Sequence, residues 1–209
     1  MTEPLTTRLF DDEDAGEIDP FVLFEEWLAM AAANEPNDPH AMALATVDAD
    51  GLPDVRMVLM NARSERGFAF FTNFESEKGR QLATNPQAAI VMHWKSIRRQ
   101  VRMRGPVEAV APEESDAYFA SRPKGSQIAS SVSRQSRPLA SRALLTAAVA
   151  ELTAEVGEGS LSRPAHWSGF RLVPLAIEFW KDGQFRLHDR VRFTRVAPEA
   201  PWSRTRLYP

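Results

Sequence analysis

The chain has 209 residues, of which 44% are hydrophobic and 25% charged, an ordinary composition for one globular domain. The formal net charge of −3 gives no general electrostatic reason to expect nucleic acid as a partner. The sequence has no cysteine, which excludes disulfides, thiolate metal sites and a cysteine nucleophile, and suits a reducing compartment.

The N-terminal segment is acidic and lacks the apolar stretch that a signal peptide or a membrane span requires. Its carboxylates include Asp11, Asp12, Glu13, Asp14 and Glu17. We expect residues 1–19 to form a mobile acidic arm of a cytoplasmic protein, followed by a single domain over residues 20–209.

Helical and strand patterns then alternate along the chain. Asp19 and Pro20 form a helix start signal ahead of an apolar stripe that extends to Leu28. Side chains that alternate in character on both sides of the turn residues 48–51 predict a hairpin of strands 41–47 and 55–60. Further strands are predicted at 67–72, 88–94, 100–105, 167–172, 176–180, 185–194 and 202–207, and helices at 76–82, 112–121 and 138–156. This order predicts a mainly β protein with helical additions, an α+β fold built on a small β-barrel.

One charged run stands out in the last part of the chain. If residues 186–190 form a strand, Arg186, His188 and Arg190 project from one face, while Leu187 and Asp189 point the other way. Three potential cations on one face favour an anionic partner. Charged strand residues are also common on a solvated face, so this run alone leaves both readings open.

The sequence offers no reactive group of its own. Its histidines, His40, His93, His166 and His188, are too scattered for a metal site, and a lone histidine is usually structural. No nucleophile elbow and no glycine-rich phosphate loop occurs. If the protein is an enzyme, its electron chemistry therefore belongs to a bound cofactor.

An ordered set of short motifs resembles the pyridoxine/pyridoxamine 5′-phosphate oxidases over about residues 21–209. The set comprises RMVLM at 56–60, FTN at 71–73, SEKG at 76–79, RQV at 99–101, SRP at 121–123, SQ at 126–127, SRQS at 133–136, EFW at 178–180 and RLHDR at 186–190. The resemblance implies the FMN-binding split β-barrel, a homodimer with two FMN molecules at the subunit interface, and oxidation by molecular oxygen.

The same resemblance implies the site residues. Cofactor contacts fall on Arg56, Met57, Val58, Leu59, Met60, Asn61, Phe71, Thr72, Lys78, Gln100, Gln135, Ser136, Trp180 and Arg190. Arg56 and Lys78 would hold the FMN phosphate, which suits a bidentate guanidinium and an ammonium. Substrate contacts fall on Tyr118, Arg122, Ser126, Arg186, Leu187 and His188. Of these, Tyr118, Arg122 and Ser126 would hold the substrate phosphate, and Arg186 and His188 are the catalytic candidates; no metal is implied.

The implied reaction is oxidation of pyridoxine or pyridoxamine 5′-phosphate to pyridoxal 5′-phosphate. A flat pyridine stacked on the flavin would place its C4′ carbon near flavin N5 for hydride transfer. Oxygen would reoxidise the flavin and yield hydrogen peroxide. With the amine substrate, an imine would be hydrolysed and ammonia released.

Several positions depart from the pattern of this family and keep two other functions open. Asn61 replaces a lysine associated with the substrate phosphate, Glu77 places a negative charge near the expected FMN phosphate, and residues 129–132 lack the usual Gly-Ala-Trp stretch. The N-terminal arm also lacks the arginine- and tyrosine-containing lid segment. Residues 130–136 resemble a serine-rich run of phenazine-biosynthesis oxidases, so oxidation of a reduced phenazine-type or other flat heteroaromatic substrate is an alternative. A split-barrel protein that binds flavin without turnover is a further one.

Overall fold

The computed structural model describes residues 5–10 and 18–209. Its strands are β1 (Ala41–Val47), β2 (Pro53–Leu59), β3 (Ala62–Ser64), β4 (Gly67–Asn73), β5 (Gln87–Trp94), β6 (Arg99–Ala109), β7 (Trp167–Leu172), β8 (Ala176–Lys181), β9 (Asp189–Thr194) and β10 (Ser203–Leu207). The helices are α1 (Leu5–Arg8), α2 (Pro20–Asn34), α3 (Glu77–Thr84), α4 (Pro112–Ser121), α5 (Lys124–Val132) and α6 (Arg142–Val156), with a 3-10 turn, η1 (Gln184–Arg186).

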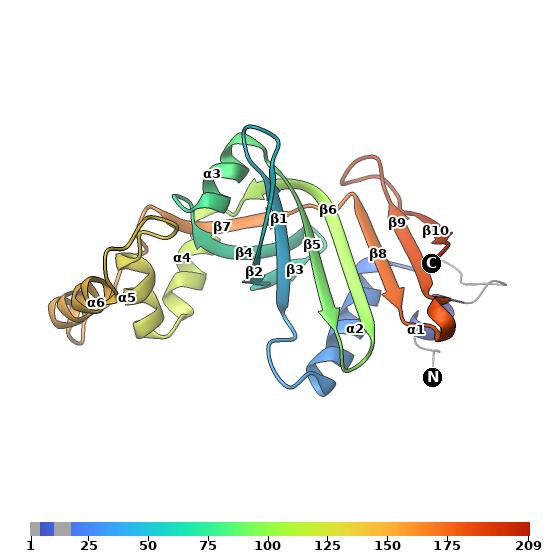
Figure 1. The fold of residues 1–209 in the computed structure, drawn as a ribbon, viewed down its shortest axis with the longest axis horizontal. Helices are drawn as coiled ribbons and strands as arrows, with labels where there is room; N and C mark the ends of the chain where they lie inside the picture. Colours follow the sequence, from blue (N-terminus) through green and yellow to red (C-terminus); the bar gives the residue numbers. More distant parts are fainter. Residues whose placement is uncertain (1–4, 11–17) are drawn as a thin grey trace.

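The strands form one curled sheet whose pairs are antiparallel (Figure 1). Its main path runs β10-β9-β8-β6-β5-β1-β2, while β3, β4 and β7 form a branch. The long strand β6 joins the two parts, because residues 99–104 pair with β8 and residues 107–109 pair with β7. The predicted mainly β architecture with helical additions is confirmed.

Helix α2 supplies much of the core. The Asp19 carboxylate caps it by accepting a 2.7 Å hydrogen bond from the Phe21 amide, and Pro20 occupies the first turn, where no amide donor is needed. Phe24 packs edge-on against Phe68 of β4 with ring centroids 4.9 Å apart, and Trp27 packs against Phe179 of β8 at 5.1 Å. These contacts hold the two parts of the sheet against one helix.

The helices after β6 differ in part from the prediction. Helix α6 begins at Arg142, four residues later than predicted, and Ser141 caps it. Helix α5 was not predicted, because its sequence KGSQIASSV contains too few apolar residues to show a helical period. No residue of α6 is buried, and Figure 1 shows α5 and α6 at the end of the molecule farthest from β9 and β10.

The N-terminal segment is partly ordered, which departs from the expected mobile arm over residues 1–19. Residues 5–8 form α1, and the Glu26 carboxylate accepts hydrogen bonds from the amides of Leu5 and Thr6. Leu9 is fully buried and Ile18 is nearly so, both within the main core. Apolar burial therefore fixes this part of the segment. The acidic residues 11–14 and 17 lie outside the described residues.

The expectation of a continuous strand over residues 185–194 was wrong in its first part. Strand β9 starts at Asp189, and Gln184–Arg186 form the turn η1, in which Phe185 and Arg186 have left-handed φ values of 56° and 66°. A Cβ atom at Gly183 would lie 1.9 Å from the Leu187 carbonyl oxygen, so the chain folds tightly back on itself. Arg186, His188 and Arg190 therefore do not share one strand face.

No described helix is both long enough and apolar enough to cross a bilayer.

Candidate functional site

A pocket of about 660 Å³ gathers residues from β2, β4, α3 and the α4–α5 region. It is lined by Arg56, Met57, Val58, Leu59, Asn61, Phe71, Thr72, Asn73, Lys78, Tyr118, Arg122, Pro123, Ser126, Ser130, Ser133, Gln135 and Trp167. Most of the predicted cofactor and phosphate contacts are in this set, although they lie far apart in the sequence. None of the described lining residues is acidic, so the pocket suits an anion.

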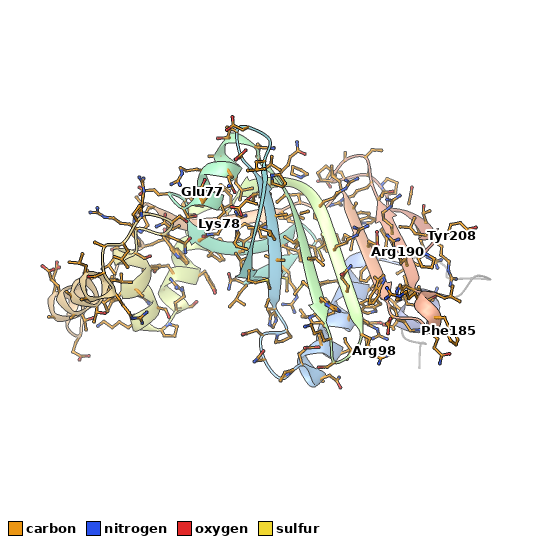
Figure 2. The ribbon with its side chains drawn as sticks, in the orientation of Figure 1. Glu77, Lys78, Arg98, Phe185, Arg190 and Tyr208 are labelled. Atoms are coloured by element: carbon orange, nitrogen blue, oxygen red, sulfur yellow. The ribbon has the colours of Figure 1, made fainter. Side chains whose placement is uncertain are left out.

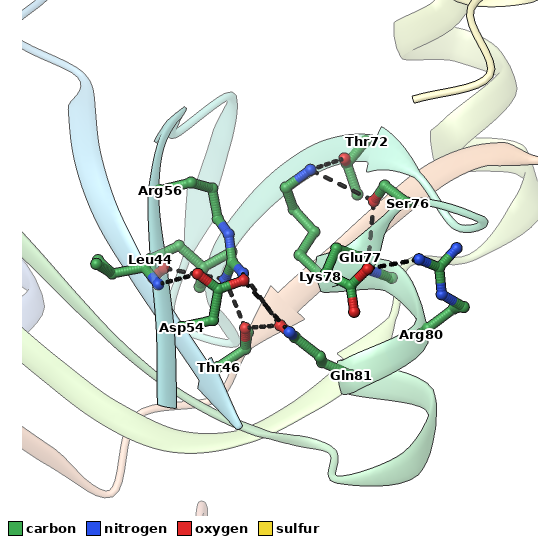
Figure 3. A network of polar contacts seen from close by, with 12 residues as sticks. Leu44, Thr46, Asp54, Arg56, Thr72, Ser76, Glu77, Lys78, Arg80 and Gln81 are labelled. Carbon is green, nitrogen blue, oxygen red and sulfur yellow. Dashed lines mark hydrogen bonds and ion pairs between the residues drawn. The ribbon is translucent and has the colours of Figure 1, made fainter. Parts of the chain in front are cut away.

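The guanidinium of Arg56 is held at the wall of the pocket by a polar network (Figure 3). Its Nη1 donates to the Leu44 carbonyl at 3.2 Å and to the Thr46 hydroxyl, and its Nη2 donates to Gln81 Oε1 at 3.0 Å and pairs with Asp54. The hydrogen bond from Gln81, together with the charge of Arg56, lowers the pKa of Asp54. The network therefore orients Arg56 with its planar fork fixed.

Lys78 lies beside Arg56 in the second position of α3. Its ammonium donates to Gln135 Oε1 at 2.8 Å, to Thr72 Oγ1 at 3.2 Å and to Ser76 Oγ at 3.3 Å. Burial, followed by repulsion from Arg56, lowers the pKa of Lys78 to about 8. Among the described residues no carboxylate forms an ion pair with Lys78, and its hydrogen-bond acceptors are neutral oxygen atoms, while Asp54 acts on its charge only from a distance. A phosphate fits this position, because it supplies the missing negative charge next to the N-terminus of α3.

A second cationic group lies at the α4–α5 side of the pocket. Arg122 Nη1 donates to Ser130 Oγ at 2.9 Å, and its guanidinium carbon lies 4.7 Å from the centre of the Trp167 ring. Burial lowers the pKa of Arg122. Phe71 stacks on Tyr118 and on Trp167, with ring centroids 4.2 Å and 5.4 Å away, and the Tyr118 and Trp167 ring centroids are 6.1 Å apart. The pocket thus combines a held guanidinium with a wall of nearly parallel aromatic rings.

Two of the departures from the family pattern have a clear geometry. Asn61 Oδ1 accepts a 3.2 Å hydrogen bond from the Phe71 amide, which leaves the side-chain NH₂ group of Asn61 as a neutral donor at the pocket wall. Glu77 is exposed and pairs with Arg80 at 2.6 Å on α3 (Figures 2 and 3). Glu77 is not among the lining residues, so its charge does not oppose an anion in the pocket.

Several of the remaining predicted contacts form a second cluster outside this pocket. Gln100, Trp180 and Arg190 are neighbours across β6, β8 and β9, and the His188 ring centre lies 4.8 Å from that of Trp180. Arg190 donates two hydrogen bonds, of 3.0 and 2.9 Å, to the buried Glu178.

The two clusters are separated within one chain. Strands β1, β5 and β6 lie between β2 and β8, which gives four interstrand steps, or roughly 19 Å along the sheet. Figure 2 shows Lys78 and Arg190 on different parts of the molecule. Arg186 and Leu187 are exposed near Arg190, Met60 faces the core, and Ser136 adjoins Gln135 outside the pocket. A single chain therefore does not bring all predicted contacts around one ligand.

Sequence reasoning missed several residues that shape the pocket. Trp167 pairs with Asn73 across β4 and β7, and Ser130 reaches the pocket through Arg122. Thr46 and Gln81 act behind Arg56. Only the serine-rich composition near residue 130 gave any signal. Sheet pairing places Trp167 and Thr46, and helix α3 places Gln81. The described residues hold no group of three or more histidine, aspartate or glutamate side chains that could share a metal ion.

Comparison with known proteins places the chain in a family. A family model described as pyridoxamine 5′-phosphate oxidase matches residues 29–155, and a second, described as the pyridoxine 5′-phosphate oxidase C-terminal dimerisation region, matches residues 167–209. Proteins named pyridoxine/pyridoxamine 5′-phosphate oxidase from Brucella abortus (strain 2308) and Azorhizobium caulinodans are 57% and 59% identical. The first match covers 99% of this chain and 100% of the relative, and the second covers 99% and 95%.

Solved structures agree with the fold. PhzG from Burkholderia lata 383, in complex with tetrahydrophenazine-1-carboxylic acid, is 34% identical with a TM-score of 0.85, over 91% of this chain and 93% of that one. An FMN-binding protein from Nostoc punctiforme PCC 73102, described as related to pyridoxamine 5′-phosphate oxidase, has a TM-score of 0.74 at 16% identity, over 92% and 99% of the two chains. The predicted split-barrel fold is confirmed, and the chain belongs to the pyridoxamine 5′-phosphate oxidase family of oxidoreductases.

Proposed function

We propose that the protein is an FMN-dependent oxidase that converts pyridoxine 5′-phosphate or pyridoxamine 5′-phosphate to pyridoxal 5′-phosphate, with O₂ as acceptor and H₂O₂ as product. The observation that carries this proposal is the charge pattern of the pocket. Two separate cationic groups, Arg56 with Lys78 and Arg122 with its serine partner, line one space without an acidic lining residue among those described. Two phosphates, one of the cofactor and one of the substrate, match two such groups.

In this proposal the FMN phosphate binds at Arg56, Lys78 and Thr72. Lys78 exchanges its neutral partners for a phosphate oxygen. The four terminal N–H groups of Arg56 are taken by its network, so Arg56 contributes its positive charge and its Nε–H group in a fixed position. Met57, Val58 and Leu59 of β2 line the same pocket and supply apolar surface for a flat ring. When bound there, FMN would supply the two-electron redox chemistry between the substrate and oxygen.

The substrate phosphate is proposed to bind at Arg122 and Ser126, beside Tyr118. Ser130 and Trp167 keep the Arg122 guanidinium in place, and the stacked rings of Phe71 and Tyr118 exclude water from one side. These residues contribute mainly by orienting a flat substrate, and not by supplying a reactive side chain.

The second cluster is proposed to complete the site of a partner subunit in a homodimer. The matched dimerisation region contains Trp180, Arg186, His188 and Arg190. Arg186 extends into solvent, and the described residues offer its side chain no hydrogen bond or ion pair. Strand β2 also exposes apolar side chains next to the pocket, with Met57 65% exposed. Contact with a second copy of the chain would bury the exposed apolar side chains of β2 and would give the exposed Arg186 side chain a binding partner. Arg186 would then clamp the substrate, and His188 would handle the proton on its C4′ substituent.

Oxidation of a reduced phenazine-type substrate is the second candidate. Asn61 favours it, since a neutral amide in place of a lysine weakens the attraction for a phosphate and tolerates a less charged group. The 34% identity to PhzG, solved with a tetrahydrophenazine carboxylic acid, is consistent with this substrate class. Retention of Arg122 and Ser126 in the pocket favours the phosphorylated substrate.

A peroxide assay on FMN-loaded protein tests the proposal. Purified protein is reconstituted with FMN and supplied with pyridoxine 5′-phosphate, pyridoxamine 5′-phosphate or a reduced tricyclic phenazine carboxylic acid. Peroxide with the first two supports the proposal, and peroxide with the phenazine alone supports the second candidate. Protein that binds FMN but produces no peroxide with any of them would be a flavin binder, and failure to bind FMN would contradict all three functions.

A further inference from the structure

The turn between β8 and β9 brings a carboxylate to the candidate catalytic histidine. His188 Nδ1 lies 3.2 Å from Asp182 Oδ1, and the Gly183 amide nitrogen lies 3.2 Å from the same Nδ1 atom. The other oxygen of Asp182 pairs with Arg98 Nη1 at 3.2 Å. The imidazole also packs against Trp180, with ring centres 4.8 Å apart. One nitrogen of His188 is thus engaged by its own loop.

We propose that Asp182 is a positioning residue for His188, which fixes the ring so that Nε2 is the nitrogen presented to the substrate. This inference rests on the proposed function of His188. Sequence analysis did not single out Asp182, because its contact with His188 depends on η1, which forms where the start of a strand was predicted. The chain reverses tightly at Gly183, so His188 comes back to the Gly183 amide five residues later. This reversal also brings His188 next to Asp182.

The two neighbours of Nδ1 require opposite protonation states. The Gly183 amide is a donor, so it bonds to Nδ1 only when that nitrogen carries a lone pair. The Asp182 carboxylate is an acceptor, so it bonds to Nδ1 only when that nitrogen carries a proton. The carboxylate charge 3.2 Å away attracts a proton on Nδ1 more strongly than the neutral Gly183 amide attracts the lone pair, and Asp182 therefore favours the Nδ1–H tautomer.

The Nδ1–H tautomer suits the proposed role. It leaves a lone pair on Nε2, which can take a proton from the C4′ substituent of the substrate. Once protonated, the ring forms an ion pair with Asp182, whose charge balances the imidazolium. Without the carboxylate, the Gly183 amide would favour the tautomer with the proton on Nε2, which cannot accept another at that atom.

The other charged groups on this loop leave the contact in place. Arg98 uses Oδ2 of Asp182 and leaves Oδ1 to His188. Lys181 and Arg206 both pair with Asp189, on the far side of His188 in the sequence, at 3.7 and 2.8 Å. Arg98 and Phe185 lie at the same end of the molecule in Figure 2. The Arg98 side chain is 78% exposed, so replacing it removes one partner of Asp182 and leaves the contact between Asp182 and His188 in place.

The test compares the Asp182→Asn and Asp182→Ala variants with the unaltered protein, all in the FMN-loaded full-length form. Nitrogen-15 NMR of the ring nitrogens, with His188 assigned from the signals lost in His188→Gln, reports the tautomer in the alkaline part of the titration. We expect Nδ1–H in the unaltered protein and a shift toward Nε2–H in both variants. With pyridoxine 5′-phosphate, kcat should fall about tenfold, while KM and FMN affinity stay within about twofold.

Arg98→Asn serves as the matched control. Asparagine tolerates the left-handed φ of 51° at this position, and the substitution removes only the partner of Oδ2. It should keep the tautomer and kcat of the unaltered protein. The proposal is overturned if the Asp182 variants keep the Nδ1–H tautomer or if their kcat is unchanged. If the unaltered protein produces no peroxide from either phosphorylated substrate, the proposed function fails, whereas the NMR comparison still decides the role of Asp182.

Discussion

Lys78 donates a 2.8 Å hydrogen bond to Gln135, a residue 57 positions away, and so joins helix α3 to the segment that follows α5. Both residues line the same pocket, and Thr72 bonds to each of them. The ammonium is therefore held among neutral oxygen atoms at the place where the FMN phosphate is proposed to bind. The charge of this ammonium should therefore control the affinity for FMN.

Affinity for FMN should fall as the pH rises through about 8. The pKa of Lys78 is lowered to about 8 from an ordinary 10.5, so the ammonium is charged below this value and neutral above it. The FMN phosphate remains a dianion above about pH 6 and prefers the charged form. Titration of flavin fluorescence should show a dissociation constant that rises by at most about tenfold per pH unit above 8. Lys78→Met should bind more weakly with no such rise, and an equal pH dependence in both proteins would remove Lys78 from the phosphate site.

Gly79→Ala should disrupt the phosphate end of the pocket. A Cβ atom at Gly79 would lie 2.2 Å from the Phe74 carbonyl oxygen, and backbone cannot yield as a side chain does. We expect a loss of about 2 kcal/mol or more in the free energy of unfolding, measured with urea, together with weaker FMN binding. Gly125→Ala is the matched control in α5, where no atom lies within 4 Å, and it should be neutral or stabilising by up to about 1 kcal/mol. Equal effects of the two substitutions would contradict this account.

Ser130→Ala should weaken substrate binding without weakening FMN binding. The substitution removes the hydroxyl that accepts the 2.9 Å hydrogen bond from Arg122, at a cost of about 1 kcal/mol for a partly exposed pair. The KM for pyridoxine 5′-phosphate should rise about fivefold, with kcat within about twofold. Ser131→Ala is the control, since Ser131 donates to the same Gln127 carbonyl as Ser130 and forms no hydrogen bond with Arg122. A similar KM in the Ser130 and Ser131 variants would argue against the positioning of Arg122.

Asn61→Lys should improve capture of a phosphorylated substrate. The new ammonium would add a charge-assisted bond worth roughly 1.5–3 kcal/mol, less the lost bond from the Phe71 amide to Asn61. Steady-state kinetics should show the KM for pyridoxine 5′-phosphate falling about tenfold, with little change for a substrate that lacks a phosphate. An unchanged KM would show that residue 61 is not near the substrate phosphate.

Arg186→Ala should leave FMN bound but reduce turnover about 100-fold, because the proposed substrate clamp is lost. The side chain is exposed in the single chain and forms no hydrogen bond or ion pair with the described residues, so the free energy of unfolding should change by less than about 0.5 kcal/mol. FMN titration and the peroxide assay measure the two effects separately. Turnover equal to that of the unaltered protein would rule out the clamp.

Local pattern predicted much of the fold. The hairpin of β1 and β2, the strand β5 and the helix α4 all appear within two residues of their predicted limits, because an alternating or helical period reports which side chains face the core. The same reliance on periodicity missed the turn η1. Arg186, Leu187 and His188 alternate between charged and apolar residues like a strand, and the left-handed φ values at Phe185 and Arg186 do not change that alternation. Helix α5 gave no signal because Ile128 and Val132 are its only large apolar residues.

The residue types of the pocket can be read along the chain, because ordered motifs carry Arg56, Lys78 and Arg122. Which of these residues meet depends on how the chain folds. Sheet pairing places Trp167 beside Asn73, and a tight turn places Asp182 beside His188. The same sheet keeps Arg56 apart from Arg190. The physical reason is that periodicity reflects contacts a few residues apart, whereas a binding site is made by strand order, register and chain reversal over long separations.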